Sequence, residues 1–433
     1  MKLFKEHKDL FLIKLFSVNS LGVVLRSVLG LISQKLIAVY LGPTGVALVG
    51  NLRNAFSLFG LGATTGIDQG VLKYQSEFDG KPIELKKLYE TSIAFSFLGS
   101  IIIFIILFFG ASFWSSYLFK TPDYAYLFVI LSFSMPFTAI YNLCFAIING
   151  QSNYKKATLL SFTTYATVTF LVIGLVVFYK LSGALLAVVL TPIAQLVSLF
   201  VFAKKELRLF SGLRVKFNKL FKNKLFVFII MAIAAVVLNN LVELQLRNHL
   251  IKKLSIKEAG YWTSILSLSN YYMSFMTGVY SLYILPKYSK MDSFKVFKLE
   301  LINIYKIIIP IFTVMFIGIY FFREFIIKLL YTSEFVPMES LFKWQLIGDL
   351  VKIVAVIMAY QFIAQKLWKI FIITEAISYI LLYFFGMYFV DKIGVEGIVF
   401  AHFLRYVVYL MMIIFLIQNI FKKQKAINEN KYS

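Results

Sequence analysis

The sequence is poor in the residues from which metal centres and nucleophilic active sites are built. Its 433 residues include one cysteine, Cys144, and three histidines, His7, His249 and His402, which are scattered along the chain. A single cysteine excludes an internal disulfide and a cysteine-based metal centre. No Walker loop, GxSxG or HExxH motif occurs. We therefore expect no metal, no cofactor and no enzymatic activity.

Charged residues are also scarce, at 15% of the chain, whereas hydrophobic residues make up 60%. Soluble domains carry about a quarter charged residues, so the balance and a mean hydropathy of +0.81 place most of the chain in lipid. Apolar runs such as residues 101–110 and 171–178 are continuous, which excludes the alternating pattern of an outer-membrane barrel. The sequence therefore predicts an all-α polytopic membrane protein with about twelve transmembrane helices.

Each expected span covers about 20 residues or slightly more. The expected spans lie near residues 15–41, 45–76, 88–112, 123–150, 155–179, 182–203, 222–249, 257–285, 298–321, 338–365, 368–390 and 395–420. The basic start of the chain leads into an apolar stretch that is too long for a cleaved signal peptide. We expect the first helix to act as an uncleaved signal anchor.

Lysine and arginine outnumber the acidic residues by 44 to 21, which gives a net charge of +23. With both termini in the cytoplasm, most of these cations fall in cytoplasmic segments, as the positive-inside rule requires. Their densest run extends from Lys204 to Lys224. Membrane topology and attraction to anionic lipid account for this charge, and nucleic-acid binding is not needed to explain it.

The same basic run divides the chain into two expected six-helix lobes, residues 1–210 and 211–433. A weak internal repeat supports the division, because Lys73-Tyr74 follows Gly45 at nearly the offset by which Lys287-Tyr288 follows Gly260. Two pseudo-symmetric lobes related by an axis along the membrane normal are typical of transporters.

Ionisable residues inside the expected spans are functional candidates, because each one is costly in hydrocarbon unless it is paired or hydrated. Cations outnumber carboxylates among them. The cations are Arg26, Lys35, Arg53, Lys73, Arg247, Lys306, Lys343, Lys352 and Arg405. The carboxylates are Asp68, Glu243, Asp349 and Glu375.

Some of these charges have local explanations. Glu243 and Arg247 are spaced i,i+4, and Asp349 and Lys352 are spaced i,i+3, so each pair can form on one helix face. Lysines near span ends can extend to the interface. Arg26, Arg53, Lys306 and Arg405 remain without a local partner, and they either line a hydrated cavity or pair across helices. A basic cavity would select an anion, because arginine forks onto phosphate oxygens and lysine supplies a movable charge.

Three segments carry a resemblance to a known family. KLIAVYLGPTGVALVGNLRNAF, GVLKYQSEF and LFKWQLIGDLVKIVAVIMAYQFIAQK resemble the Wzx-type flippases of the multidrug/oligosaccharidyl-lipid/polysaccharide exporter superfamily. The WQLxGDxxK pattern, which contains Asp349 and ends at Lys352, is the most specific part of the resemblance. The resemblance implies twelve helices in two lobes. It also implies transport of an undecaprenyl-pyrophosphate-linked oligosaccharide, such as an O-antigen unit, from the cytoplasmic to the periplasmic leaflet of the bacterial inner membrane.

The family pattern matches this chain at most of its intramembrane charges, whereas Arg405 and Asp68 fall outside it. We assign pyrophosphate binding to Arg26, Lys35, Arg53, Arg247, Lys306 and Lys352. We assign supporting or coupling roles to Asp68, Lys73, Glu243, Asp349, Glu375 and Arg405. The expected partners are the lipid-linked glycan, the bilayer and, as a further candidate, a glycan polymerase.

Two other functions remain open on the sequence. A cation-coupled exporter of small organic cations, from the drug-efflux branch of the superfamily, would need acidic residues in its cavity. A membrane glycan polymerase would need a large outer loop, and the longest expected one, near residues 322–342, is short. The flippase is the function that the intramembrane cations favour.

Overall fold

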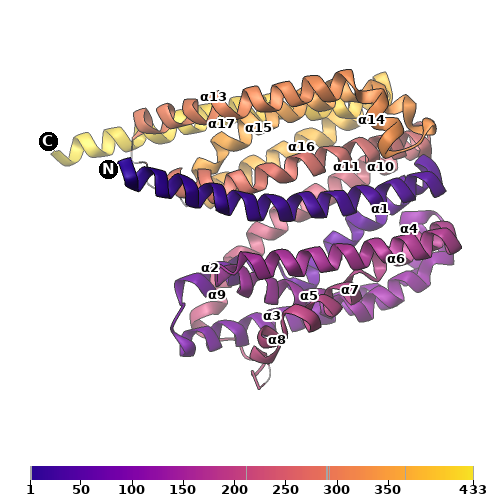
Figure 1. The fold of residues 1–433 in the computed structure, drawn as a ribbon, viewed down its shortest axis with the longest axis horizontal. Helices are drawn as coiled ribbons and strands as arrows, with labels where there is room; N and C mark the ends of the chain where they lie inside the picture. Colours follow the sequence, from indigo (N-terminus) through magenta and orange to yellow (C-terminus); the bar gives the residue numbers. More distant parts are fainter. Residues whose placement is uncertain (1, 211, 289–290, 292, 366, 433) are drawn as a thin grey trace. The chain divides into compact units, whose positions relative to one another are not determined.

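The structure, a computed structural model, describes residues 2–210, 212–288, 291, 293–365 and 367–432. Every element in these ranges is helical (Figure 1). Within them, 8 helices are long and apolar enough to cross a membrane. They are Gly22–Thr64, Pro82–Phe109, Pro122–Gly150, Tyr154–Val189, Phe294–Phe321, Ser333–Ala364, Trp368–Ile393 and Glu396–Lys422. The all-α membrane fold is thereby confirmed, and the count of twelve spans stays a prediction.

The chain forms two compact units, Met1–Leu241 and Val242–Ser433. The expected lobe boundary lay earlier, at residues 210/211, and the assignment of six spans to each lobe stays a prediction. The first unit contains α1 (Lys2–Thr64), α2 (Asp68–Glu77), α3 (Pro82–Phe109), α4 (Ala111–Phe119), η1 (Pro122–Tyr124), α5 (Ala125–Gly150), α6 (Tyr154–Val189), α7 (Thr191–Phe202), α8 (Lys204–Leu209), α9 (Lys219–Ala232), η2 (Ile233–Val237) and the start of α10 (Leu238–Lys253).

Helix α1 contains the first expected span and the first part of the second, residues 45–64, separated by a bend. Most of the rest of the second expected span falls in α2. Gly42 has φ 60° and ψ −168° at the bend. Glycine adopts positive φ without a steric penalty, which makes it the natural residue for this bend. Pro43 follows with its fixed φ and no N–H group, which suits the first turn of the next helical segment. The Gly-Pro pair thus joins two helical segments, before and after residue 42, within α1.

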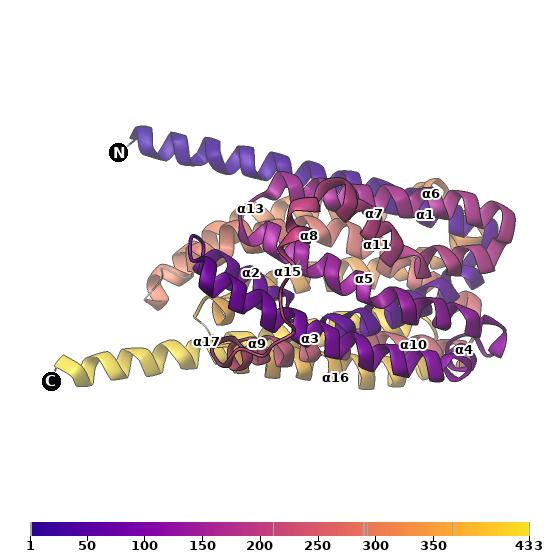
Figure 2. The same cartoon turned by 90° about the horizontal axis from the view of Figure 1, so that it is seen from below.

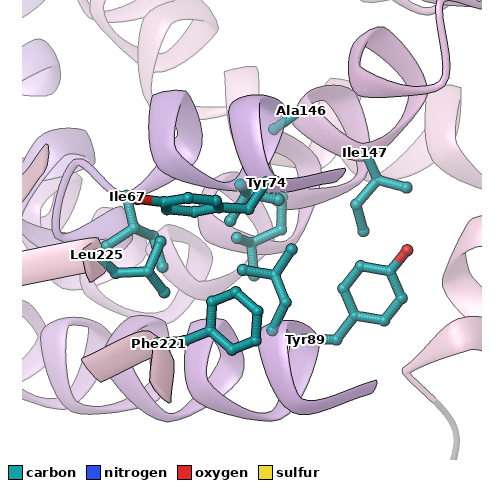
Figure 3. Close-up of a cluster of buried hydrophobic side chains, with 10 residues drawn as sticks. Ile67, Tyr74, Tyr89, Ala146, Ile147, Phe221 and Leu225 are labelled. Carbon is teal, nitrogen blue, oxygen red and sulfur yellow. The ribbon is translucent and has the colours of Figure 1, made fainter. Parts of the chain in front are cut away.

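Helices of the first unit pack in pairs. Helix α1 packs along α6, α3 along α5, and the short α8 against α5 and α7 (Figure 2). A buried apolar cluster joins α2, α3, α5 and α9 (Figure 3). Its members include Ile67, Tyr74, Tyr89, Ile147 and Phe221. The rings of Tyr74 and Phe221 meet edge to face, with centroids 5.8 Å apart, and this contact fixes α9 against α2.

The second unit contains the rest of α10, α11 (Ile256–Val279), η3 (Tyr280–Ile284), α12 (Leu285–Tyr288), α13 (Phe294–Phe321), α14 (Arg323–Leu330), η4 (Ser333–Leu341), α15 (Phe342–Ala364), α16 (Trp368–Ile393) and α17 (Glu396–Tyr432). Helix α17 packs against both α15 and α16, and α13 packs against α15. Helix α17 therefore brings polar residues of α15 and α16 to one place.

We predict that Gly99→Ala destabilises the protein by about 1–3 kcal/mol, because a Cβ on α3 would meet the carbonyl oxygens of Gly62 and Ala63 on α1. Backbone atoms cannot move aside as a flexible side chain can. Gly174→Ala on α6 is the matched control, since nothing lies within 4 Å of its added Cβ. The thermal unfolding midpoint of the purified protein in detergent measures both changes. Equal midpoints for the two variants would contradict this packing.

Candidate functional site

Asp349, on α15, is the centre of a buried polar network in the second unit. Its side chain has no exposed surface. Oδ2 accepts hydrogen bonds from Ser269 Oγ at 2.7 Å, Tyr272 OH at 2.5 Å and Gln345 Nε2 at 3.0 Å. His402 Nε2, on α17, lies 3.0 Å from Oδ1. These contacts satisfy the carboxylate within the unit and join α11, α15 and α17.

The i,i+3 ion pair expected between Asp349 and Lys352 is not formed within the described residues. The carboxylate is directed to α11 and α17, whereas the Lys352 ammonium lies near Tyr406, with Nζ 5.7 Å from the ring centroid. Helical spacing allows an ion pair between Asp349 and Lys352, but Asp349 instead contacts residues of the neighbouring helices α11 and α17. Lys352 consequently makes no direct ion pair with a carboxylate in the described part of the chain.

Arg405 lies beside the same tyrosine ring. Its Nη2 donates to Tyr406 OH at 2.6 Å, and its Cζ lies 4.3 Å from that ring centroid and 4.9 Å from the ring of Tyr379. The side chain is only 5% exposed. Two cations thus share one aromatic ring, which stabilises each of them partly through its π face.

Two donor atoms of Arg405 remain unsatisfied. Nε and Nη1 are buried and make no hydrogen bond to any described residue, and no described carboxylate forms a direct ion pair with this guanidinium. Glu375, one turn before Tyr379 on α16, instead accepts a hydrogen bond from Tyr409 OH at 2.7 Å. Leaving buried charged donors unpaired is costly. Lys352 and Arg405 together have the chemistry of an anion-binding site, since a phosphate oxygen would complete their hydrogen bonds.

Arg247, on α10, has a different environment. It is 2% exposed, its Nε donates to Thr263 Oγ1 at 2.9 Å, and its Cζ lies 5.3 Å from the Trp262 ring. These contacts join α10 to α11. Glu243, four residues earlier, is half-buried on the same helix. Arg247 therefore has a structural role within the unit, whatever else it binds.

Three of the predicted binding cations of the first unit lie on α1. Arg26 Nε donates to Gly22 O at 3.2 Å, which keeps this half-buried side chain along its own helix. Arg53 Nη1 donates to Gln34 Oε1 at 3.0 Å and so connects the two segments of α1 across the Gly42 bend. Lys35 is half-buried next to Gln34.

The remaining predicted residues do not join these groups. Lys306 is exposed on α13. Lys73 is exposed on α2, with Nζ 5.2 Å from the Tyr74 ring, and Asp68 is half-buried at the start of that helix. The structure thus gathers Asp349, Lys352, Glu375 and Arg405 around α17 and leaves the other predicted residues elsewhere in their units.

Sequence reasoning missed His402 as a site residue, because the three histidines are far apart in the chain. A usable signal was present: His402 precedes Arg405 by three residues, so the two share one face of α17. Tyr406 and Tyr379 were also missed, since buried tyrosines are common in apolar helices and only the fold places them against a cation.

We predict that Asp349→Ala lowers the free energy of unfolding by about 3–5 kcal/mol, because it leaves several buried donors without their acceptor. Asp391→Ala is the matched control, since Asp391 is 42% exposed and lies 2.9 Å from His249. Its loss should cost about 1 kcal/mol or less. Unfolding midpoints of the purified proteins compare the two, and a cost as small for Asp349 as for Asp391 would refute the network.

The sequence matches a known protein family and two characterised relatives. Residues 41–340 match the family described as polysaccharide biosynthesis protein. The lipid III flippase of Escherichia coli K12 is 28% identical over 384 residues, which cover 88% of this chain and 92% of that protein, and the lipid III flippase of Shigella flexneri matches equally.

Solved structures agree on the fold. An inward-facing MATE family transporter of the MOP superfamily superposes with a TM-score of 0.74 at 14% identity, over 93% of this chain and 96% of that one. The lipid II flippase MurJ in an inward closed conformation superposes with a TM-score of 0.72 at 17% identity. The match covers 93% of this chain and 87% of the MurJ chain. The superfamily resemblance is confirmed. This chain belongs to the polysaccharide biosynthesis protein family and has the fold of the MOP-superfamily transporters.

Proposed function

We propose that this protein is a flippase, which moves an undecaprenyl-pyrophosphate-linked oligosaccharide, such as an O-antigen or related surface glycan unit, from the cytoplasmic to the periplasmic leaflet by alternating access. The observation that carries the proposal is that Lys352 and Arg405 both lie against Tyr406. Among the described residues, neither cation makes a direct ion pair with a carboxylate, and two guanidinium donors of Arg405 have no hydrogen-bond partner. Similarity to lipid III flippases over 88% of the chain supports the same cargo class.

The pyrophosphate would supply the missing anion. Its oxygens can accept from both Arg405 donors while the Lys352 ammonium offsets a further charge, so binding would remove the cost of two unpaired cations in the membrane. Arg405 therefore moves from a supporting role to direct contact in this proposal. Asp349 keeps its supporting role, because its four contacts hold α15 and α17 in register beside the two cations.

The other predicted residues keep the roles that we expect of them. The pyrophosphate would meet Arg26, Lys35, Arg53, Arg247 and Lys306 at other depths or in other states of the cycle. Supporting or coupling roles fall to Asp68, Lys73, Glu243 and Glu375. The polyprenyl tail would stay in lipid while the glycan crosses a hydrated path, since sugar hydroxyls need water or protein partners throughout.

The membrane and partners follow from the same proposal. We place the protein in the bacterial inner membrane with both termini in the cytoplasm, because that orientation puts most lysines and arginines inside. A glycan polymerase is a proposed partner, since such an enzyme would use the unit delivered to the outer leaflet.

An exporter of organic cations is not favoured. That activity needs a free intramembrane carboxylate to hold the cargo, and Asp349 is already saturated by four neighbours. The Glu375 carboxylate accepts from Tyr409. The two cations beside this network, Lys352 and Arg405, would repel a cationic cargo.

We predict that Lys352→Gln and Arg405→Gln each reduce glycan export about tenfold or more, because each removes a charge-assisted contact to the anion. Arg26→Ala should lose export as well. Lys343→Gln is the matched control, since Lys343 lies on the same helix and is exposed. Surface glycan is measured in cells whose export depends on this chain, and membrane immunoblots verify insertion.

Normal surface glycan in both Lys352→Gln and Arg405→Gln cells would contradict the proposed anion site. Loss of export in the Lys343→Gln control, with the protein correctly inserted, would show that the assay reports general disturbance of α15 instead.

A further inference from the structure

The first unit contains a cavity that the proposed function does not use. It has a volume of about 570 Å³ and is enclosed by α3, α5 and the chain at α8. Its walls are mainly apolar, with Phe97 and Phe104 from α3 and Phe133 from α5. Phe97 and Phe133 are 53% and 59% exposed, so the cavity is open at the surface of the unit. An open apolar cavity in a membrane-spanning segment is accessible to lipid chains.

One wall of the cavity comes from a basic segment, of which the structure describes residues 204–210 and 212–218. Leu207, Phe210 and Leu213 line the cavity. The charged side chains of the same segment are exposed to the surroundings. They are Lys204, Lys205, Arg208, Arg214 and Lys216. The segment is therefore amphipathic, with an apolar face on the cavity and a cationic face beside its margin.

The basic segment contacts neighbouring helices near both of its ends. Glu206, only 4% exposed, pairs with Lys156 of α6, with Oε2 and Nζ 2.5 Å apart. The backbone N–H of Asn218 donates to Thr91 Oγ1 of α3 at 3.1 Å. These two anchors fix the cations relative to the cavity, so the combination is a built feature of the unit.

A polar atom in the cavity wall lacks a partner. Ser96 is 6% exposed and lines the cavity, and its Oγ makes no hydrogen bond with the residues that the structure describes. Ser100 and Ser132 also line the cavity. The Ser96 hydroxyl is therefore available to donate to an acceptor oxygen of a molecule bound in the cavity, such as the ester oxygen of a lipid.

We propose that this cavity binds an anionic phospholipid of the bilayer, with one acyl chain in the cavity, an ester oxygen near Ser96 and the phosphate on Lys205 and Arg208. At roughly 30 Å³ for each group the size of a water molecule, the cavity takes on the order of twenty such groups. This matches one acyl chain and is well short of a long polyisoprenoid tail. The site is independent of the proposed cargo.

The test compares lipids on the purified full-length protein. Binding of phosphatidylglycerol and of phosphatidylcholine with identical acyl chains is measured by native mass spectrometry after delipidation. We expect phosphatidylglycerol to bind more tightly, because each cation near a membrane surface contributes about 1 kcal/mol toward an anionic lipid. The double variant Lys205→Gln/Arg208→Gln should lose roughly 30-fold in phosphatidylglycerol affinity and should bind phosphatidylcholine unchanged.

Two further variants keep the result interpretable. Lys120→Gln/Lys180→Gln removes the same charge from exposed positions that do not line the cavity, and should leave both affinities unchanged. Ser100→Phe fills the cavity and should weaken both lipids. Equal binding of the two lipids to the wild type, or an equal loss in the two double variants, would overturn the proposal. Displacement of phosphatidylglycerol by a polyprenyl phosphate at lower concentration would also overturn it.

Discussion

An ionised side chain in a membrane span must find a partner, and this constraint organises the second unit. Asp349 meets it with neighbours from two other helices and from its own. Those contacts hold α17 against α15, and α17 carries Arg405 into the same region. Arg405 does not meet the constraint within the described chain, since two of its donors stay unsatisfied. The satisfied carboxylate thus positions an unsatisfied cation, which is the arrangement that a transporter of anions needs.

In the first unit, charged side chains are stabilised by an amide and by an ion pair. Arg53 reaches an amide across the bend of α1, and Lys156 pairs with Glu206 where the basic segment meets α6. Exposed cations of that segment lie beside an apolar cavity, where lipid phosphate and lipid chain can both be accommodated. Buried charges in this unit therefore fix its helices, while the cations of the basic segment are exposed.

The limits of several helices could be predicted from the sequence, because the hydropathy of a span depends on its own residues and not on its neighbours in the fold. The Gly42-Pro43 bend fell between two expected spans, and α15 and α16 lie within about four residues of their expected limits. The contacts of the site residues were harder to predict, because they depend on which helices pack against each other. Helical spacing favoured Asp349 with Lys352, whereas α17 supplied His402, 53 residues away in sequence. Arg405 was found as an intramembrane cation, but its contact with Tyr379 depends on the packing of α16 against α17.

The central claim is that intramembrane cations hold the anionic head of a lipid-linked cargo. The most direct measurement is the affinity of the purified protein in nanodiscs for a polyprenyl pyrophosphate and for the corresponding uncharged polyprenyl alcohol. The account predicts that the pyrophosphate binds at least about tenfold more tightly and that the Lys352→Gln/Arg405→Gln double variant abolishes the difference. Equal affinity of the wild-type protein for the two lipids would contradict it.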